Sequence, residues 1–179
     1  ISLCEVAGLF ADDLDRVLVR ADRAVRAEAE EDAAHGLVRF DGHRFTTFDV
    51  DDGLPVASAN RLLITRDGGY WVATNGGGVA RFNLAANPSY VIALKPQSAG
   101  AVFTHFPVGD NARSARVNEL FEDPVGRIWA GTDGGLFRLD NRQGRFESVP
   151  FEFLGTPDKL LLIWALEVDR EGSLWIGSN

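Results

Sequence analysis

The sequence has no methionine and only one cysteine, Cys4, among its 179 residues. A single cysteine excludes an internal disulfide framework and a cysteine-rich zinc site, and it leaves the redox compartment open. The three histidines, His35, His43 and His105, lie too far apart along the chain to indicate a ligand cluster. We therefore expect neither a metal site nor a cofactor. From the missing methionine we expect the chain to be a piece of a longer or processed protein.

Long apolar runs and basic charge are also scarce. No run approaches the roughly 18 apolar residues of a membrane span, and no signal segment, with its charged start and apolar middle, opens the chain. Lys and Arg total 18 against 26 Asp and Glu, a net charge of -8 that argues against a phosphate-backbone partner. We expect no nucleic acid as a partner, and contact with a membrane only through segments outside this chain. The 45% hydrophobic content is enough for the core of one or two domains.

The stretch 123–140 is the clearest copy of a repeat. Two apolar runs in it, one around Trp129 and one at 136–139, are joined by an Asp-Gly-Gly turn suited to the positive φ angles of a tight hairpin. Further apolar runs precede and follow this hairpin behind glycine-containing turns. The four runs are 117–122, 127–132, 136–139 and 145–149. Four short strands that reverse on successive turns predict a meander sheet.

Five columns of this stretch recur at fixed offsets in the units before and after it. They are Trp71, Trp129 and Trp175; Leu62, Leu120 and Leu166; Gly68, Gly126 and Gly172; Thr74, Thr132 and Ser178; and Asn75, Asp133 and Asn179. The second and third tryptophans of the column are 46 residues apart, near the roughly 40 to 50 residues of a four-stranded propeller blade. The first interval is longer and contains a loop-like insertion at 84–100.

The sequence therefore predicts an all-β fold, a partial β-propeller of four-stranded antiparallel blades with a short N-terminal helical segment. Residues 35–179 should form the arc: the end of one blade, two full blades near 49–106 and 107–152, and the start of a fourth. The innermost strands are expected near 59–65, 116–122 and 162–168.

Residues 1–34 differ in pattern from the rest. From Asp12 to Ala34 the chain has no proline or glycine, and its apolar residues fall at helical spacing among charged ones. These apolar residues are Leu14, Val17, Leu18, Ala21, Ala24 and Val25. The pattern predicts an amphipathic helix in a separate segment, either a signalling or docking helix or a capping, poorly ordered leader.

The repeated columns carry a resemblance to a known family. Asp-Gly-Leu-Pro at 52–55 precedes an expected innermost strand, and the pattern Asp-x-x-Gly-x-Ile/Leu-Trp-x-Gly-Thr/Ser-Asp/Asn occupies 123–133 and 169–179. Over about residues 35–179 the chain resembles the two-component regulator propeller repeat, the extracytoplasmic sensor region of bacterial hybrid histidine kinases and of some diguanylate cyclases. The second unit departs from the pattern, with Thr65 in place of the aspartate and an extra glycine in 76–78.

This resemblance implies a ligand-sensing propeller domain of a bacterial two-component-type signalling receptor, in the periplasm or otherwise outside the cytoplasm. It implies no enzyme activity in this chain, because kinase or cyclase activity would belong to other segments, and a homodimer is one expected state of the full receptor. Two alternatives stay open from the residues themselves: a propeller-type carbohydrate hydrolase or lyase fragment, and a protein-interaction scaffold.

Most of the repeated residues are expected to be structural. Trp71, Trp129 and Trp175 should each bury a ring between neighbouring blades. Asp123 and Asp169 should accept hydrogen bonds from the amides of their own turns. Their repetition from unit to unit argues against a catalytic pair of carboxylates.

Ligand discrimination should instead come from the end of the blades where the units differ, which we name the upper rim. It comprises the loops leading into the innermost strands, 51–60, 110–118 and 156–163, and the hairpin turns 75–78 and 133–135. Its candidate ligand-binding residues are Asn60, Arg61, Arg113, Arg116, Asn118, Lys159 and Trp164. Amide and guanidinium donors beside an aromatic ring suit a small polar ligand such as an oligosaccharide. In the alternative interpretation, Asn60 and Asn118 tie the loops to neighbouring blades and the arginines are solvated.

Overall fold

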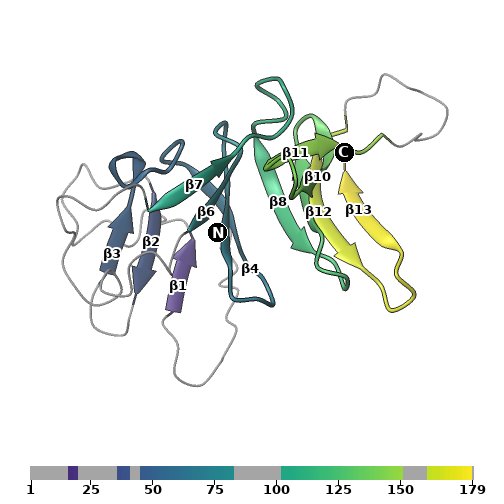
Figure 1. The fold of residues 1–179 in the computed structure, drawn as a ribbon, viewed down its shortest axis with the longest axis horizontal. Helices are drawn as coiled ribbons and strands as arrows, with labels where there is room; N and C mark the ends of the chain where they lie inside the picture. Colours follow the sequence, from purple (N-terminus) through teal and green to yellow (C-terminus); the bar gives the residue numbers. More distant parts are fainter. Residues whose placement is uncertain (1–15, 20–35, 41–44, 83–101, 151–160, 179) are drawn as a thin grey trace, which may run out of the picture.

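The computed structural model describes residues 16–19, 36–40, 45–82, 102–150 and 161–178 (Figure 1). The strands are β1 (Arg16–Val19), β2 (Leu37–Phe40), β3 (Phe45–Phe48), β4 (Ala59–Ile64), β5 (Tyr70–Thr74), β6 (Val79–Phe82), β7 (Phe103–Phe106), β8 (Val117–Glu122), β9 (Ile128–Thr132), β10 (Gly135–Asp140), β11 (Arg145–Ser148), β12 (Ile163–Val168) and β13 (Leu174–Ser178). They form four sheets, in the orders β1-β2-β3, β4-β5-β6-β7, β11-β10-β9-β8 and β12-β13. The helical content of the described residues is one 3-10 turn, η2 (Val50–Asp52).

The sheets follow one another as successive blades, from β1–β3 at the left of Figure 1 to β12–β13 at its right. The fold is all-β, a partial β-propeller whose second and third blades have four antiparallel strands each, as the sequence predicts. The innermost strands β4, β8 and β12 begin and end within one residue of their expected bounds. At the turn between β9 and β10, Gly135 has a φ of 115°, a conformation that favours glycine.

Near the N-terminus the chain departs from the prediction. Residues Arg16–Val19 are a strand that pairs antiparallel with β2, so the predicted helix is wrong at these four positions. Val17, Leu18 and Val19 are consecutive apolar residues, two of them β-branched, and such residues suit a strand when a sheet edge is available. β1 lies beside β2 where a complete blade has its tryptophan strand. The other residues of the predicted helix, and the insertion 84–100, lie outside the described part of the chain.

The two most regular columns of the repeat lie on opposite faces of each blade. Leu120 of the third blade packs in one cluster with Trp71 of the second, and Leu166 of the fourth packs in another with Trp129 of the third. Each leucine therefore faces the preceding blade and each tryptophan the following one. A large apolar side chain buried in this way contributes about 1.5–3 kcal/mol, so the interfaces between blades form the core.

Burial within the tryptophan column depends on the presence of a following blade. Trp71 is 5% exposed and Trp129 is half-buried, as expected of residues between blades. Trp175 is 66% exposed, so its predicted burial is wrong in this structure. The reason is that no sheet of the described residues follows β12–β13 to cover the ring.

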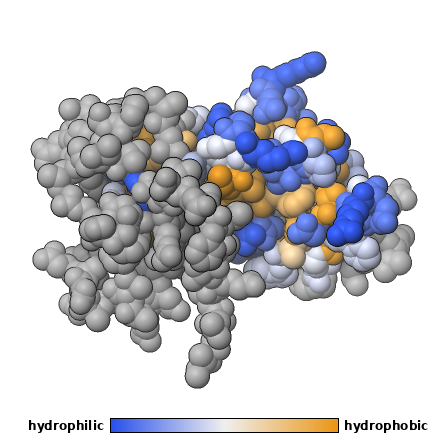
Figure 2. All heavy atoms as spheres, turned by 90° about the horizontal axis from the view of Figure 1, so that it is seen from below, coloured by the Kyte–Doolittle hydropathy of each residue, from blue (hydrophilic) through white to orange (hydrophobic). Residues whose placement is uncertain are grey.

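Close approach between blades also requires small residues. A Cβ at Gly131 would lie 2.5 Å from Cγ2 of Ile163 in the next blade, closer than any side chain can come without displacing its neighbour. Seen from the end of the blades opposite the upper rim, hydrophobic residues gather in the middle of the described part, with hydrophilic residues toward its edges (Figure 2). The apolar interfaces thus extend through the blades to that end.

Candidate ligand-binding rim

Each innermost strand has a register shift at the residue that opens onto the upper rim. In β4 the shift falls between residues 59 and 61 and leaves Asn60 as the extra residue of a bulge. The same shift leaves Asn118 extra in β8 and Trp164 extra in β12. A bulge re-aims the side chain of its extra residue. One structural device therefore displays three of the predicted site residues at the same point of successive blades.

The two asparagines use this bulge to reach the next blade. The side-chain amide of Asn60 donates a hydrogen bond to the carbonyl of Val117 at 2.8 Å, and that of Asn118 donates to the carbonyl of Ile163 at 3.1 Å. Both acceptors are the first residues of the following innermost strand. These two hydrogen bonds match the alternative interpretation, in which Asn60 and Asn118 join neighbouring blades. Any contact of these asparagines with a ligand would be additional to this structural role.

Asp133 is the residue around which predicted site residues of the third blade meet. Its carboxylate accepts a hydrogen bond from the Asn118 amide at 2.9 Å and lies 3.6 Å from a guanidinium nitrogen of Arg116. Its carbonyl accepts a bond from Nε of Arg113 at 3.3 Å, and its backbone amide donates to the carbonyl of Arg116 at 3.1 Å. The sequence pattern marks Asp133 only as a turn residue. Its negative charge could have indicated a special role, because the other two residues of its column, Asn75 and Asn179, are uncharged.

The loop that leads into β8 is ordered by its own sequence. The Asn111 side chain accepts hydrogen bonds from the amides of Arg113 and Ser114, and the buried Ser114 hydroxyl donates to the carbonyl of Asn111. Two glycine amides of the turn 75–78 donate to the carbonyl of Ala115 across the blade boundary. These hydrogen bonds hold the backbone that carries Arg113 and Arg116. The side chains of both arginines are exposed.

Arg61 does not join this group. Its Nε lies 2.9 Å from the carboxylate of Glu119, which makes an ion pair between β4 and β8. Burial raises the pKa of Glu119, while the Arg61 guanidinium opposes that rise and Glu167 adds to it. Arg61 is therefore engaged with the neighbouring blade, in a connecting role.

Trp164 is exposed at the upper rim, with 57% of its surface accessible. It directly follows Ile163, whose carbonyl accepts the Asn118 bond, so it lies beside the contact between the third and fourth blades. An exposed indole next to hydrogen-bonding groups can cover the apolar face of a polar ligand. Lys159 lies outside the described residues.

The opposite end of the blades, which we name the lower rim, consists of the turns 65–69, 123–127 and 169–173. Asp123 and Asp169 each accept hydrogen bonds from two amides of their own turn, as predicted. Each carboxylate also accepts a bond from the indole N–H of its blade's tryptophan, which sequence reasoning missed. Burial acts to raise the pKa of Asp123, but the bonds from Trp129 and Arg127 outweigh it and hold the pKa below its ordinary value. These carboxylates are therefore occupied by structural bonds.

In the second blade, Asp67 takes over part of this turn role from the missing aspartate. Its carboxylate accepts hydrogen bonds from the Thr65 hydroxyl and the Gly69 amide. The bond from Thr65, followed by that from Gly69, lowers the pKa of Asp67. The departure of this unit from the repeat pattern thus preserves a carboxylate in the turn.

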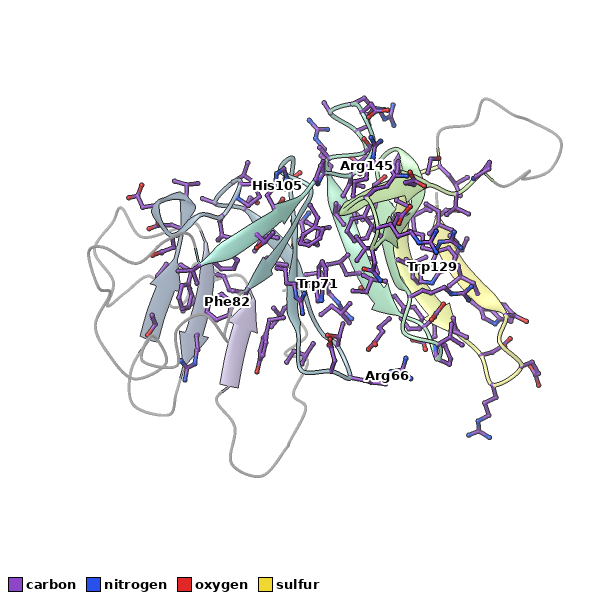
Figure 3. All side chains as sticks on the ribbon, viewed as in Figure 1. Arg66, Trp71, Phe82, His105, Trp129 and Arg145 are labelled. Carbon is purple, nitrogen blue, oxygen red and sulfur yellow. The ribbon has the colours of Figure 1, made fainter. Side chains whose placement is uncertain are left out.

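Two further polar contacts lie on the side of the upper rim toward the outer strands (Figure 3). Arg145 lies 3.4 Å from the exposed carboxylate of Asp110, and Nε2 of His105 lies 2.7 Å from the carbonyl oxygen of Gly77. Among the described residues, no three His, Cys, Asp or Glu side chains are grouped so that they could hold a metal ion. No helix in the described ranges has the length and apolar character needed to cross a membrane.

Solved structures with this arrangement of blades give the chain a context. The extracellular domain of the putative hybrid two component system BT4673 from B. thetaiotaomicron matches with a TM-score of 0.60 and 24% identity, over 80% of this chain and 17% of that one. The corresponding domain of BT3049 from the same organism matches with a TM-score of 0.56 and 19% identity, over 80% of this chain and 16% of that one. The chain shares their fold. No protein-family model and no curated protein sequence matches it.

A third similar structure comes from a secretion system. It is PorZ, an essential bacterial surface component of the type-IX secretion system of Porphyromonas gingivalis, with a TM-score of 0.54 and 19% identity over 82% of this chain and 22% of that one. The chain thus spans no more than 22% of the length of each of these proteins. At these identities the likeness establishes the fold, and the function has to come from the residues of the site.

Proposed function

We propose that this chain belongs to a ligand-sensing propeller of a bacterial two-component-type signalling receptor, and that a polar ligand such as an oligosaccharide binds at its upper rim. The extracellular domains of BT4673 and BT3049, which have the same fold, support a sensor role outside the cytoplasm. In this proposal, kinase or cyclase activity lies elsewhere in the receptor. Dimerisation of the full receptor, and its attachment to a membrane through other segments, stay predictions from the sequence.

The observation that carries the proposal is the group that Arg113, Arg116 and Asn118 form around Asp133, with the exposed Trp164 directly after Ile163, the acceptor of the Asn118 bond. The side chain of Arg116 is 54% exposed and Trp164 is 57% exposed. A carboxylate, guanidinium groups and an amide can bind successive hydroxyl groups, while an indole covers the apolar face of a sugar ring. Each hydrogen bond is worth about 0.5–1.5 kcal/mol net, so several of these groups must act together.

The repeated carboxylates of the lower rim favour a structural role over hydrolysis. Asp123 and Asp169 are held by turn amides and indole N–H groups. A glycosidase uses two carboxyl groups about 5–10 Å apart on either side of the scissile bond, one of them able to donate a proton. Carboxylates that already accept several structural hydrogen bonds are poorly suited to that role.

Isothermal titration calorimetry of the chain against a panel of neutral and acidic oligosaccharides tests the proposal. Trp164→Ala should weaken the binding of any oligosaccharide that binds the wild type by about tenfold, which corresponds to 1.4 kcal/mol. Trp175→Ala is the matched control, because Trp175 is also more than half exposed but its indole N–H is bonded to Asp169 at the lower rim. This control should bind like the wild type.

Two outcomes would oppose the proposal. Oligosaccharide binding that survives both Trp164→Ala and Arg116→Ala would place the site away from the upper rim. A wild-type chain that binds no member of the panel, but binds a protein through the upper rim, would favour the interaction scaffold.

A further inference from the structure

Arg66 clamps the second blade to the third at the lower rim (Figure 3). Its backbone amide donates to the carboxylate of Glu122 at 2.8 Å, and its guanidinium donates to the carbonyls of Asp123 at 2.5 Å and Pro124 at 2.8 Å. Its Nε also lies 3.5 Å from the Glu122 carboxylate. One residue thus joins two successive lower turns through its backbone and its whole guanidinium group.

The junction between the third and fourth blades lacks the counterparts of both Arg66 and Glu122. In the register of the repeat, Pro124 occupies the position of Arg66, and Val168 occupies that of Glu122. Proline has neither a side-chain donor nor an amide hydrogen, and valine offers no acceptor. The turns 123–127 and 169–173 both belong to the described residues, and within these residues no hydrogen bond or ion pair joins the two turns.

At the upper rim, by contrast, both junctions keep their asparagine bond. Asn60 holds Val117, and Asn118 holds Ile163. Below that point, the third and fourth blades meet at the apolar cluster that contains Leu166, and the like charges of Glu119 and Glu167 repel each other. Apolar attraction is non-directional, whereas a hydrogen bond weakens steeply as its angle changes. Among the described residues, the contacts between the third and fourth blades therefore restrict the angle less than those between the second and third.

We propose that the fourth blade pivots on the third about the bond from Asn118 to Ile163, so that the lower rim opens and closes while the upper rim stays joined. The same amide nitrogen of Asn118 also donates to Asp133, 2.9 Å away, and the pivot therefore lies inside the proposed ligand-binding group. A ligand that competes for Asp133 changes the bonds of Asn118 and with them the angle between the blades. The pivot follows from the contacts alone, whereas its control by a ligand rests on the proposed function.

Distances between spin labels, measured by double electron–electron resonance in the chain carrying Cys4→Ser, test the pivot. Ile64, at the end of β4, is exposed beside the lower turn 65–69, and Val125 and Glu171 are exposed in the next two lower turns. Labelled cysteines at 64 and 125 span the clamped junction, and labelled cysteines at 125 and 171 span the unclamped one. We expect a narrow distance distribution for the first pair and a broader one for the second.

Variants that add the clamp at one junction, or remove it at the other, test whether it restricts the angle between blades. Pro124→Arg combined with Val168→Glu installs the clamp and should narrow the 125/171 distribution to the width of the 64/125 pair. Pro124→Ala combined with Val168→Ala, which changes the same positions without adding charges, should leave it broad. Arg66→Ala should broaden the 64/125 distribution. Equal widths for both pairs in the unmodified turns, or a 125/171 distribution that stays broad with the clamp installed, would overturn the pivot.

Asp133→Ala tests the link to the upper rim without a ligand. Loss of the acceptor should shift the 125/171 distribution and leave the 64/125 distribution unchanged. Asp133→Asn, which keeps an acceptor oxygen for Asn118, should behave like the wild type. An unchanged 125/171 distribution in Asp133→Ala overturns the coupling even if oligosaccharides bind, and a failure of every oligosaccharide to bind overturns the proposed function even if the pivot is found.

Discussion

Asn60 and Val117, 57 residues apart in the sequence, are joined by a 2.8 Å hydrogen bond from the side-chain amide of one to the backbone carbonyl of the other. The same bond recurs one blade later, from Asn118 to Ile163. The variable residues of the upper rim therefore include some that hold the blades together. Substitutions there divide into those that disturb the scaffold and those, such as Trp164→Ala, that disturb an exposed surface, and only the second kind reports on ligand binding alone.

Asn60→Asp should lower the free energy of unfolding by about 1–3 kcal/mol, because aspartate keeps the size of the side chain but cannot donate to the Val117 carbonyl. Urea unfolding followed by circular dichroism measures the change. Asn75→Asp makes the same chemical change at an exposed position of the same rim and should cost less than about 0.5 kcal/mol. An Asn60→Asp variant as stable as the wild type would show that the bond does not stabilise the junction.

Trp129→Ala should lower the free energy of unfolding by about 3 kcal/mol, the lower part of the range for a tryptophan in a core, because the ring is half-buried. The ring packs between the third and fourth blades, stacks with Arg127 and Arg138, and donates to Asp123. Trp175→Ala, in the same column, should cost less than about 1 kcal/mol because its ring is 66% exposed. Equal costs in thermal or urea unfolding would contradict the assignment of Trp129 to the core.

Asp123 should make stability depend on pH on the acid side. Hydrogen bonds hold its pKa in the folded chain below the ordinary value of 3.8, so its contribution is fully present above that value. The contribution is lost as the pH falls through the folded pKa. Urea unfolding at several pH values from about 5 downward should therefore show a steeper loss of stability in the wild type than in Asp123→Asn. Asp110→Asn, which alters an exposed carboxylate, is the control, and parallel pH profiles for Asp123→Asn and the wild type would count against the interpretation.

The blades could be predicted because each is a local meander whose turns and tryptophans recur at fixed offsets. Every strand of the third blade pairs with its neighbour along the chain, so short-range turn chemistry determines the sheet order. β1 could not be predicted in the same way. Its spacing of apolar residues suits a helix, and its strand state depends on pairing with β2, across a segment outside the described residues. Tertiary pairing overrides local propensity at such positions.

At the site, the sequence identified several residues that the structure brings together, but it did not identify the residue that joins them. Asp133 organises the group through contacts with loops and strands on both sides of it, and column position alone marks it as part of a turn. The roles of Arg61 and Arg66 depend on which residues of the next blade face them. A repeat pattern fixes the structure within a blade and leaves the polar contacts between blades undetermined.

The chain contains four tryptophans, and their indole N–H groups report on different parts of the molecule. Trp164 lies at the upper rim, Trp71 is buried between blades, and Trp129 and Trp175 donate to carboxylates of the lower rim. A nitrogen–proton correlation spectrum of the 15N-labelled chain, recorded during titration with an oligosaccharide that binds in calorimetry, follows all four groups at once. We predict that the Trp164 signal shifts with saturation and that the Trp71 and Trp175 signals stay in place. A smaller shift of Trp129, whose ring packs between the third and fourth blades, would report the change in angle between them. No shift of Trp164 at saturation, or a shift of Trp175 as large as that of Trp164, would contradict a ligand site at the upper rim.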